Sequence, residues 1–488
     1  MRKAMIRKPA QEESFPLVWF RVTGVIILVM SFLIGRLGGN FDYSVPQDLR
    51  PIPTLVLYLL IWFGAYFFAL ERVRTIRTSD ARGMTMIWIL FVGLVARIFF
   101  FPPHAIQETD FYRYFWDGQA VLQGANPYRL SPQEAYLLSE KPAVRGNPHM
   151  EGVFEYINFP DVKTIYPPFA QYLFAFSQML SPWSVWGWKG MIFAADAMIV
   201  VILMALLGRL KLKREWIVLY AWSPLILKEF HNNLHLDIFA LLFVCLMIYG
   251  VSRKWTSFSF AALACAVAVK WFALILLPLL LRVTWKTPGQ AVFHASLFGG
   301  TMVLFYLPFV PAGHALWDGL ITFSLLWKVN AGVFHLITLF FQSLSLSEEG
   351  VRLASRLVVA LIFAAIFCVV MRWLWKKRDV MSFCRASLVL TASLFFLIPT
   401  GNPWYYSWIF PFLIFSPLRS LILFSGLVLL YYLDFYFMYQ DRRELFEWVR
   451  LVEYGLFFMA LGWELWTKNR QSPSLFRSAT RSAALQRP

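Results

Sequence analysis

Near its N-terminus the chain carries the apolar run LVWFRVTGVIILVMSFLIG, which covers Leu17–Gly35. A helix needs about 20 mostly apolar residues to cross the hydrocarbon core of a bilayer, and the single charged residue in this run is Arg21. Basic residues precede the run and no clear small-residue cleavage site follows it, so we expect an uncleaved signal-anchor helix. The run therefore predicts that the chain enters a membrane at its first helix.

Apolar runs of this kind recur along the whole chain. Hydrophobic residues make up 59% of the 488 residues and charged residues only 15%, whereas soluble domains carry about 25% charged residues. We therefore predict an all-α fold, a polytopic transmembrane helical bundle of roughly 11–14 spans. Two apolar runs, at 169–180 and 334–344, are too short to be assigned as membrane spans. The region 317–356 cannot be divided clearly into spans and loops. The other candidate spans are Pro53–Leu70, Met84–Phe101, Lys189–Leu207, Trp216–Leu227, Leu236–Val251, Phe258–Leu281, Ala291–Pro308, Leu353–Trp375, Arg385–Pro399, Trp404–Phe415, Leu418–Phe437 and Val449–Trp466.

The basic residues predict the orientation, because cytoplasmic loops carry an excess of Lys and Arg. This rule places the N-terminus in the cytoplasm and makes the polar segment 104–165 a large non-cytoplasmic loop that carries amphipathic helices. We expect one multi-pass transmembrane domain over 1–467 and a basic cytoplasmic tail over 468–488, in a bacterial inner or plasma membrane. The other clusters expected inside are Arg72–Arg82, Arg209–Arg214, Arg253–Lys254 and Arg372–Arg378.

The net charge of +17 is explained by this topology and by contact with anionic membrane lipids. No nucleic-acid motif accompanies it. The four cysteines lie in or beside apolar runs without metal-ligand spacing. His231 and His235 are one helical turn apart, but the glutamate that a zincin carries after its first histidine is absent. We therefore predict no metal, no other cofactor and no nucleic-acid partner.

The expected outer loop opens with a dense group of charged and aromatic residues, ETDFYRYFWDG, over 108–118. Carboxylates at the mouth of a membrane helix are costly to place and usually functional. Glu108 and Asp110 are close enough to share one site, and Asp110, Arg113 and Asp117 recur near helical spacing. The alternative interpretation is a solvated amphipathic helix that lies on the membrane.

Two later segments fall on the same predicted side. The segment 223–237 either binds a polar ligand by hydrogen bonding or caps an interfacial helix, and 402–405 either lines a site or forms a turn with interface anchors. Because the orientation came from basic loops alone, this gathering of polar residues favours a functional site. The first segment holds Glu229, His231, His235 and Asp237, and the second holds Asn402 and Tyr405.

Lys270 lies inside the expected span Phe258–Leu281. A lysine at this depth needs a partner or a route to a surface. It meets an anionic lipid headgroup if the helix breaks there, or it extends its side chain to the interface.

The quoted motif carries a family resemblance. The stretch DFYRYFWDG at 110–118, followed by GANPY at 124–128, closely resembles bacterial polyprenol-phosphate-mannose-dependent mannosyltransferases and related family 87 glycosyltransferases, which belong to the GT-C superfamily of membrane enzymes. The likeness runs from about Glu108 to Phe412. The relatives usually carry paired aspartates where this chain has Thr109 and Asp110. Supporting segments follow in the family's order at 166–168, 223–237, 269–270 and 402–405.

The resemblance implies a hexosyltransferase that moves a sugar, with mannose favoured, from a polyprenyl-phosphate-linked donor to a hydroxyl of a lipid, glycan or protein acceptor, with inversion. Asp110 is then the general base that takes the acceptor's proton, with Glu108 as the second catalytic candidate. Donor phosphate would be held by Arg113, Lys270 and His235. The candidate contacts to sugar or acceptor are Tyr112, Trp116, Asp117, Glu229, His231, Asp237, Asn402 and Tyr405.

Two other functions compete with this one. A transporter or flippase of lipid-linked sugar would account for the many spans and for Lys270, but it predicts inverted repeats, and the sequence shows no internal repeat. A glycan polymerase or ligase would use the same outer loop, so only substrate assays separate it from a hexosyltransferase.

Overall fold

The computed structural model describes residues 14–75, 82–101, 104–138 and 148–471. Within them the chain is helical, and the one pairing of extended backbone is an isolated bridge between Val329 and Thr400. The predicted all-α class is therefore confirmed. The basic N-terminal cluster and the expected tail beyond Gln471 lie outside the described residues.

Long helices build the body of the molecule, and short helices and turns connect them. The longer helices are α1 (Ser14–Leu37), α2 (Ile52–Thr75), α3 (Arg82–Phe100), α8 (Val185–Arg209), α11 (Asp237–Arg253), α12 (Thr256–Val269), α14 (Pro288–Tyr306), α17 (Glu348–Leu374), α18 (Val380–Leu397) and α23 (Phe446–Gln471). The shorter helices are α4 (Asp110–Leu122), α5 (Pro132–Leu138), α6 (Pro148–Glu155), α7 (Pro168–Leu180), α9 (Val218–Ala221), α10 (Pro224–Ile226), α13 (Leu277–Thr284), α15 (Ala315–Leu326), α16 (Val333–Ser343), α19 (Pro403–Tyr406), α20 (Phe410–Leu413), α21 (Arg419–Leu427) and α22 (Tyr432–Tyr439). One π-helix, η4 (Leu227–Asn232), and 3-10 turns complete the chain: η1 (Gly38–Phe41), η2 (Gln47–Leu49), η3 (Arg214–Ile217), η5 (Trp271–Leu276), η6 (Leu307–Ala312), η7 (Ser407–Ile409), η8 (Val428–Tyr431) and η9 (Arg443–Leu445).

Eight helical segments of the described chain are long and apolar enough to cross a membrane, so the protein is an integral membrane protein with several spans. This number is below the roughly 11–14 predicted, because other expected spans are short or interrupted, and the long helix α23 carries several charged residues. The eight segments are Val18–Phe41, Gln47–Arg74, Gly83–Phe100, Val185–Arg209, Pro288–Ala312, Glu348–Leu374, Val380–Leu397 and Arg419–Tyr439.

The expected single span Phe258–Leu281 is wrong, because the chain reverses direction at Lys270. This residue has an extended backbone (φ −150°, ψ 127°) between α12 and η5. The start of α12 lies against α14, with the rings of Phe260 and His294 stacked at 5.0 Å. Since α14 begins soon after α13 ends, the start of α12 and the end of α13 lie at the same end of the bundle. A buried ammonium must find a counter-charge, and the break lets Lys270 do so.

The expected span Trp404–Phe415 is also interrupted. It consists of α19, η7 and α20, and Pro403 and Pro411 each stand in the first turn of a short helix. Proline lacks the backbone N–H that a continuing helix needs, so it begins helices rather than extending them.

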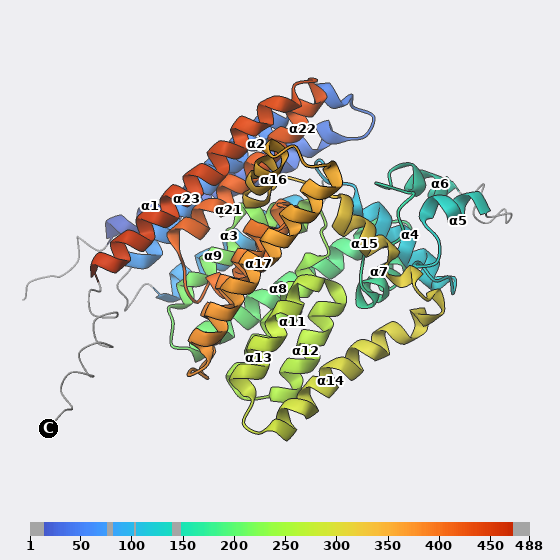
Figure 1. Cartoon of the computed structure of the whole chain (residues 1–488). Helices are drawn as coiled ribbons and strands as arrows, with labels where there is room; N and C mark the ends of the chain where they lie inside the picture. Colours follow the sequence, from blue (N-terminus) through green and yellow to red (C-terminus); the bar gives the residue numbers. More distant parts are fainter. Residues whose placement is uncertain (1–13, 76–81, 102–103, 139–147, 472–488) are drawn as a thin grey trace, which may run out of the picture.

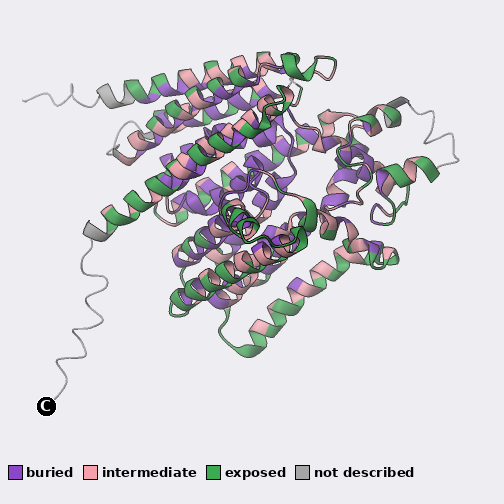
Figure 2. Cartoon of the chain, turned by 45° about the horizontal axis from the view of Figure 1, so that its top comes forward, coloured by how far each residue is buried: buried purple, intermediate pink, exposed green. Residues whose placement is uncertain are grey.

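The helices form a packed bundle with one specialised end. In Figure 1, α1 packs on α2 and α3, and α11 packs between α8 and α12. Figure 2 shows α14 with a largely exposed outer surface. Only 11% of the residues in the apolar stretch of this segment are buried in the protein, as expected of a helix that faces lipid. The segment with α4, α5, α6 and α7 gathers at one end of the molecule (Figure 1).

The expected non-cytoplasmic loop therefore contains helices, as predicted. The helix that follows it, α7, has 13 residues, fewer than the ~20 that a span requires. It packs along α4 and against α8. This agrees with the interpretation of 169–180 as too short to cross the membrane.

Candidate active site

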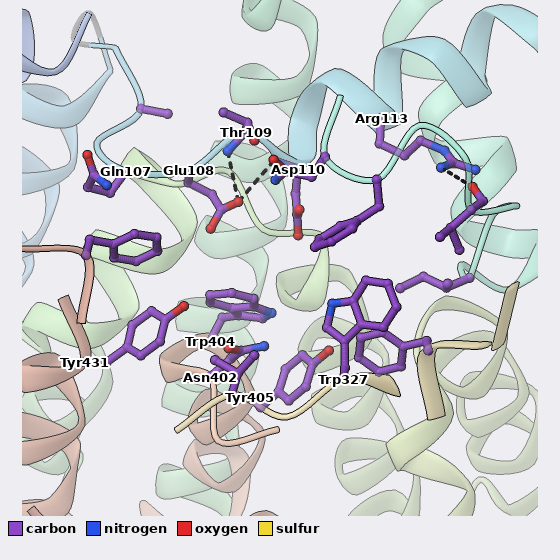
Figure 3. A pocket seen from close by; sticks show the side chains of 18 of the residues that line it. Gln107, Glu108, Thr109, Asp110, Arg113, Trp327, Asn402, Trp404, Tyr405 and Tyr431 are labelled. Atoms are coloured by element: carbon purple, nitrogen blue, oxygen red, sulfur yellow. Dashed lines mark hydrogen bonds between the residues drawn. The ribbon is translucent and has the colours of Figure 1, made fainter. Parts of the chain in front are cut away.

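A cavity of about 450 Å³ opens where the loop after α3 faces the connection between α18 and α19. Figure 3 shows Glu108 and Asp110 across the cavity from Asn402, Trp404 and Tyr405. Six of the thirteen predicted site residues line it: Glu108, Asp110, Arg113, Lys270, Asn402 and Tyr405. The lining residues come from the segments 41–50, 105–113, 158–166, 323–329, 402–405 and 431–439, together with Lys270.

The two predicted catalytic carboxylates sit at the start of α4. Oε1 of Glu108 accepts hydrogen bonds from the backbone N–H groups of Thr109 at 2.9 Å and Asp110 at 3.1 Å (Figure 3). These N–H groups belong to the helix terminus, which attracts negative charge. Glu108 thus fixes the first turn of α4, and Asp110 occupies the first helical position with its carboxylate directed at the cavity.

Burial controls the protonation of both carboxyl groups. Desolvation raises the pKa of Glu108 well above its usual range, and the charge of Asp110 adds to this shift. Desolvation also raises the pKa of Asp110, while the charge of Lys270 and a hydrogen bond from Asn158 partly oppose the change. A carboxylate with a raised pKa is a stronger base than one in water.

Lys270 stands at the break after α12 and reaches the cavity from within the bundle. Its ammonium lies 3.4 Å from Oδ2 of Asp237 and 4.7 Å from the ring centre of Tyr405. The other oxygen of Asp237 accepts a hydrogen bond of 2.7 Å from the indole of Trp408. Asp237 therefore balances the charge of Lys270 and does not line the cavity itself.

Arg113 is bound in a similar way. Its Nε lies 2.8 Å from Oδ1 of Asp117, one helical turn further along α4, and its Nη1 donates to the carbonyl of Val162 at 2.8 Å. Asp117 is 1% exposed and also faces the amide of Gln171. The structure places Asp117 behind Arg113, with no access to the cavity.

His235 lies behind Glu108 and not on the cavity wall. Its Nε2 is 3.5 Å from a carboxylate oxygen of Glu108 and 3.5 Å from one of Glu229, and its ring stacks on Trp404 at 3.9 Å. Glu229 in turn accepts a hydrogen bond of 2.5 Å from the hydroxyl of Tyr432. This buried cluster supports Glu108 from the side opposite the cavity.

The remaining predicted residues lie away from the cavity. Tyr112 packs on Phe111 and Tyr156, and Trp116 packs on Phe154. His231 lies inside the bundle, where its Nε2 is 3.4 Å from Asp196, which also pairs with Arg97.

Sequence analysis missed several lining residues. Arg50, Asn158 and Trp327 all stand in stretches without a motif. Trp404 and Tyr431 are aromatic residues of a kind that is common at membrane interfaces, so the sequence does not single them out. Only the folded chain brings them to the carboxylates (Figure 3). In the described part of the chain no group of three or more His, Cys, Asp or Glu residues is arranged to hold a metal.

Comparison with known proteins places this site in a family. Residues 21–286 match the family model of the alpha-(1→6)-mannopyranosyltransferase N-terminal domain. The match covers more than half of the chain and includes Glu108, Asp110 and Lys270. No curated protein and no solved structure gives a match. The chain therefore belongs to the alpha-(1→6)-mannopyranosyltransferase family, whose model spans both the carboxylate loop and the lysine that meet in this cavity.

Proposed function

We propose that this cavity moves a mannosyl group from a polyprenyl-phosphate-linked donor to an acceptor hydroxyl, with inversion and with Asp110 as general base. The observation that carries the proposal is the position of Asp110. Its carboxylate lines the cavity at the N-terminus of α4. Of the other carboxylates nearby, Glu108 accepts backbone hydrogen bonds from Thr109 and Asp110, and Asp117 and Asp237 are paired with Arg113 and Lys270. A base must reach the proton that it removes.

The reaction follows from this arrangement. The acceptor oxygen attacks the anomeric carbon of mannose while its proton passes to Asp110. The bond between the anomeric carbon and the phosphate oxygen breaks, and its electron pair stays on that oxygen. The products are a mannoside and polyprenyl phosphate. Inversion gives an α-linked product only from a β-linked donor.

The acceptor is proposed to be a glycan. The family description names a 1→6 linkage, in which the reacting hydroxyl stands on carbon 6 of a sugar. Tyr405 and Trp404 offer aromatic faces to the cavity, and Asn402 offers an amide whose buried Oδ1 has no hydrogen-bond partner in the described part of the chain. Aromatic faces and amide groups of this kind bind sugar rings and hydroxyls.

Charge distribution supports an extracytoplasmic cavity. Helix α2 starts beside the cavity at Arg50 and, after about 36 Å, ends near Arg74. The ammonium of Lys213 donates a hydrogen bond to the backbone carbonyl of Arg74, and the guanidinium of Arg74 donates one to the carbonyl of Pro417. Since cytoplasmic ends are rich in basic residues, the cavity would face the opposite side.

The test is turnover of a synthetic polyprenyl-phosphate β-mannose by the purified protein in detergent, followed by mass spectrometry, for the native chain and for Asp110→Asn. We expect the variant to keep donor binding and to lose about 10²–10⁴-fold in kcat, as for removal of a general base. The α-linked donor anomer is the matched control and should not be consumed.

Equal turnover by the native chain and Asp110→Asn would remove Asp110 as the base. Consumption of the α-anomer with formation of an α-mannoside would contradict inversion. If no polyprenyl-phosphate sugar is consumed by the native chain, the donor class itself is wrong.

A further inference from the structure

Four cationic side chains line the cavity, and three of them are already paired with a carboxylate. The lining cations are Arg50, Arg113, Lys163 and Lys270. The pairs are Arg113–Asp117 at 2.8 Å, Lys163–Asp318 at 2.9 Å and Lys270–Asp237 at 3.4 Å. Among the described residues, Arg50 forms no ion pair. The positive charge of Arg50 is therefore not balanced by a carboxylate of the described chain and is available to an anionic ligand.

Arg50 is buried, and the one side-chain hydrogen bond that it forms in the described part of the chain has a neutral acceptor. The residue is 8% exposed. Its Nη1 donates to the side-chain carbonyl of Gln107 at 3.0 Å, while its buried Nε has no hydrogen-bond partner in the described part of the chain. The nearby carboxylate of Asp42 accepts hydrogen bonds from Ser44 instead.

Such an arrangement is unfavourable in the absence of a ligand. Burial removes water from a guanidinium, and an amide oxygen satisfies one N–H without balancing the charge. A fork of donors with an uncompensated charge matches a phosphate group, which can accept two N–H bonds at once.

The reaction requires a cation of this kind. The donor phosphate is a diester, and when its bond to the anomeric carbon breaks, the departing polyprenyl phosphate gains one negative charge. A preorganised donor group at that position stabilises the transition state more than the bound substrate. Lys270 and Arg113 supply less net charge, because Asp237 and Asp117 neutralise them.

The hydrogen-bonded neighbours of Arg50 lie toward one end of the cavity. Gln107, the partner of Arg50, lies with Tyr431 toward one end of the cavity, while Arg113 and Trp327 lie toward the other (Figure 3). The amide of Gln107 donates to the hydroxyl of Tyr439 at 2.8 Å.

We propose that Arg50, oriented by Gln107 and assisted by the hydroxyl of Tyr439, binds the phosphate of the polyprenyl-phosphate donor and of the leaving polyprenyl phosphate. This assignment rests on the proposed function and deepens it. It assigns the donor phosphate to Arg50, whereas the family resemblance assigned it to Arg113, Lys270 and His235.

The test measures binding of polyprenyl phosphate to the purified full chain by microscale thermophoresis, with dephosphorylated polyprenol as the second probe. Arg50→Gln keeps a side chain that can hydrogen-bond to Gln107 but removes the charge, and Arg50→Lys keeps the charge but removes the fork. We expect Arg50→Gln to weaken polyprenyl phosphate binding roughly tenfold or more, as for loss of a charge-assisted hydrogen bond, and Arg50→Lys to weaken it less. Arg129→Gln, an exposed arginine outside the cavity, is the matched control.

The control probes separate phosphate recognition from distortion of the cavity. Polyprenol should bind the native chain and Arg50→Gln equally, and an equal loss for both lipids would overturn the assignment. Inorganic phosphate should compete with the lipid in the native chain and compete less in Arg50→Gln. Unchanged polyprenyl phosphate binding by Arg50→Gln would also overturn it. A native chain that binds polyprenyl phosphate through Arg50 but transfers no mannose would refute the proposed function and leave this subsite standing.

Discussion

Glu108 and Asp110 are two residues apart, yet their carboxylates have different surroundings. Oε1 of Glu108 accepts two backbone N–H bonds, and its Oε2 lies 3.5 Å from Nε2 of His235. The carboxylate of Asp110 is oriented by the helix that it begins and faces the cavity. This difference supports the proposal that Glu108 positions the first turn of α4 and that Asp110 takes the proton.

The pH dependence of activity should report this pair. A general base works when deprotonated, and burial raises the pKa of Asp110 above its ordinary value of about 3.9. Activity is then complete above the raised pKa and is lost as the pH falls through it. The pKa of Glu108 is raised further than that of Asp110, so Glu108 is uncharged where Asp110 titrates, and Glu108→Gln should leave the acid limb of kcat/KM in place. Lys270→Gln removes a positive charge that lowers the pKa of Asp110 and should move the acid limb to higher pH.

The measurement is donor consumption across the acid range for the native chain and Glu108→Gln. Glu155→Gln changes an exposed carboxylate of α6 outside the cavity and should leave the profile in place. An acid limb that moves to lower pH in Glu108→Gln, or that stays fixed when Lys270→Gln is measured in the same way, would show that the charges around Asp110 do not act as described.

The two carboxylates of the cavity could be predicted from the sequence more readily than the residues around them. Glu108, Asp110 and Asn402 could be named because short motifs carry them. His235 stands in a motif too, but whether its ring faces the cavity or the back of Glu108 depends on packing between α-helices distant in sequence. Arg50 could not be predicted as a site residue, because a single basic residue in a loop bears only on the orientation of the chain in the membrane.

Helix α4 holds Asp110 in place through a close contact with α7. A Cβ added at Gly118 would lie 2.6 Å from the backbone carbonyl of Phe174, closer than real Cβ atoms approach. Gly118 is also about 12 Å along α4 from Asp110. Any side chain at Gly118 must therefore push the two helices apart and tilt the start of α4.

We expect Gly118→Ala to destabilise the protein by about 1–3 kcal/mol, as for overpacking, and to lower kcat more than tenfold, because small displacements of a catalytic group are costly. Thermal unfolding in detergent and donor turnover measure the two effects. Gly152→Ala in α6 is the control, since an added Cβ there meets nothing within 4 Å. A fully active Gly118→Ala would show that this contact does not position Asp110.

The helix breaks were only partly visible in the sequence. Pro403 and Pro411 signal the short pieces of α19 and α20. The reversal at Lys270 has no proline, and the apolar run around it reads as one continuous span. The break depends on Asp237 of α11, the counter-charge that meets Lys270 after folding.

Considered as a whole, the molecule has a cavity end and a basic end, and the reversal at Lys270 settles which loops belong to each. The end of α13 lies beside the basic end, where Arg282 stacks on Trp375 at 4.9 Å. The segment between α13 and α14 therefore lies opposite the cavity. If 258–281 were one continuous span, that segment would lie on the cavity side.

Cysteine labelling distinguishes these arrangements. In a background with the four native cysteines replaced, Gly39→Cys in η1 and Gly289→Cys in α14 each place a thiol at an exposed position where an added Cβ meets nothing within 4 Å. We expect a membrane-impermeant maleimide to label Gly39→Cys in intact cells and to label Gly289→Cys only after permeabilisation. Labelling of both in intact cells would mean that the chain does not reverse at Lys270. Labelling of Gly289→Cys alone would show the opposite orientation, with the cavity on the cytoplasmic side. That result would refute the extracytoplasmic assignment but would leave the proposed chemistry at Asp110 untouched.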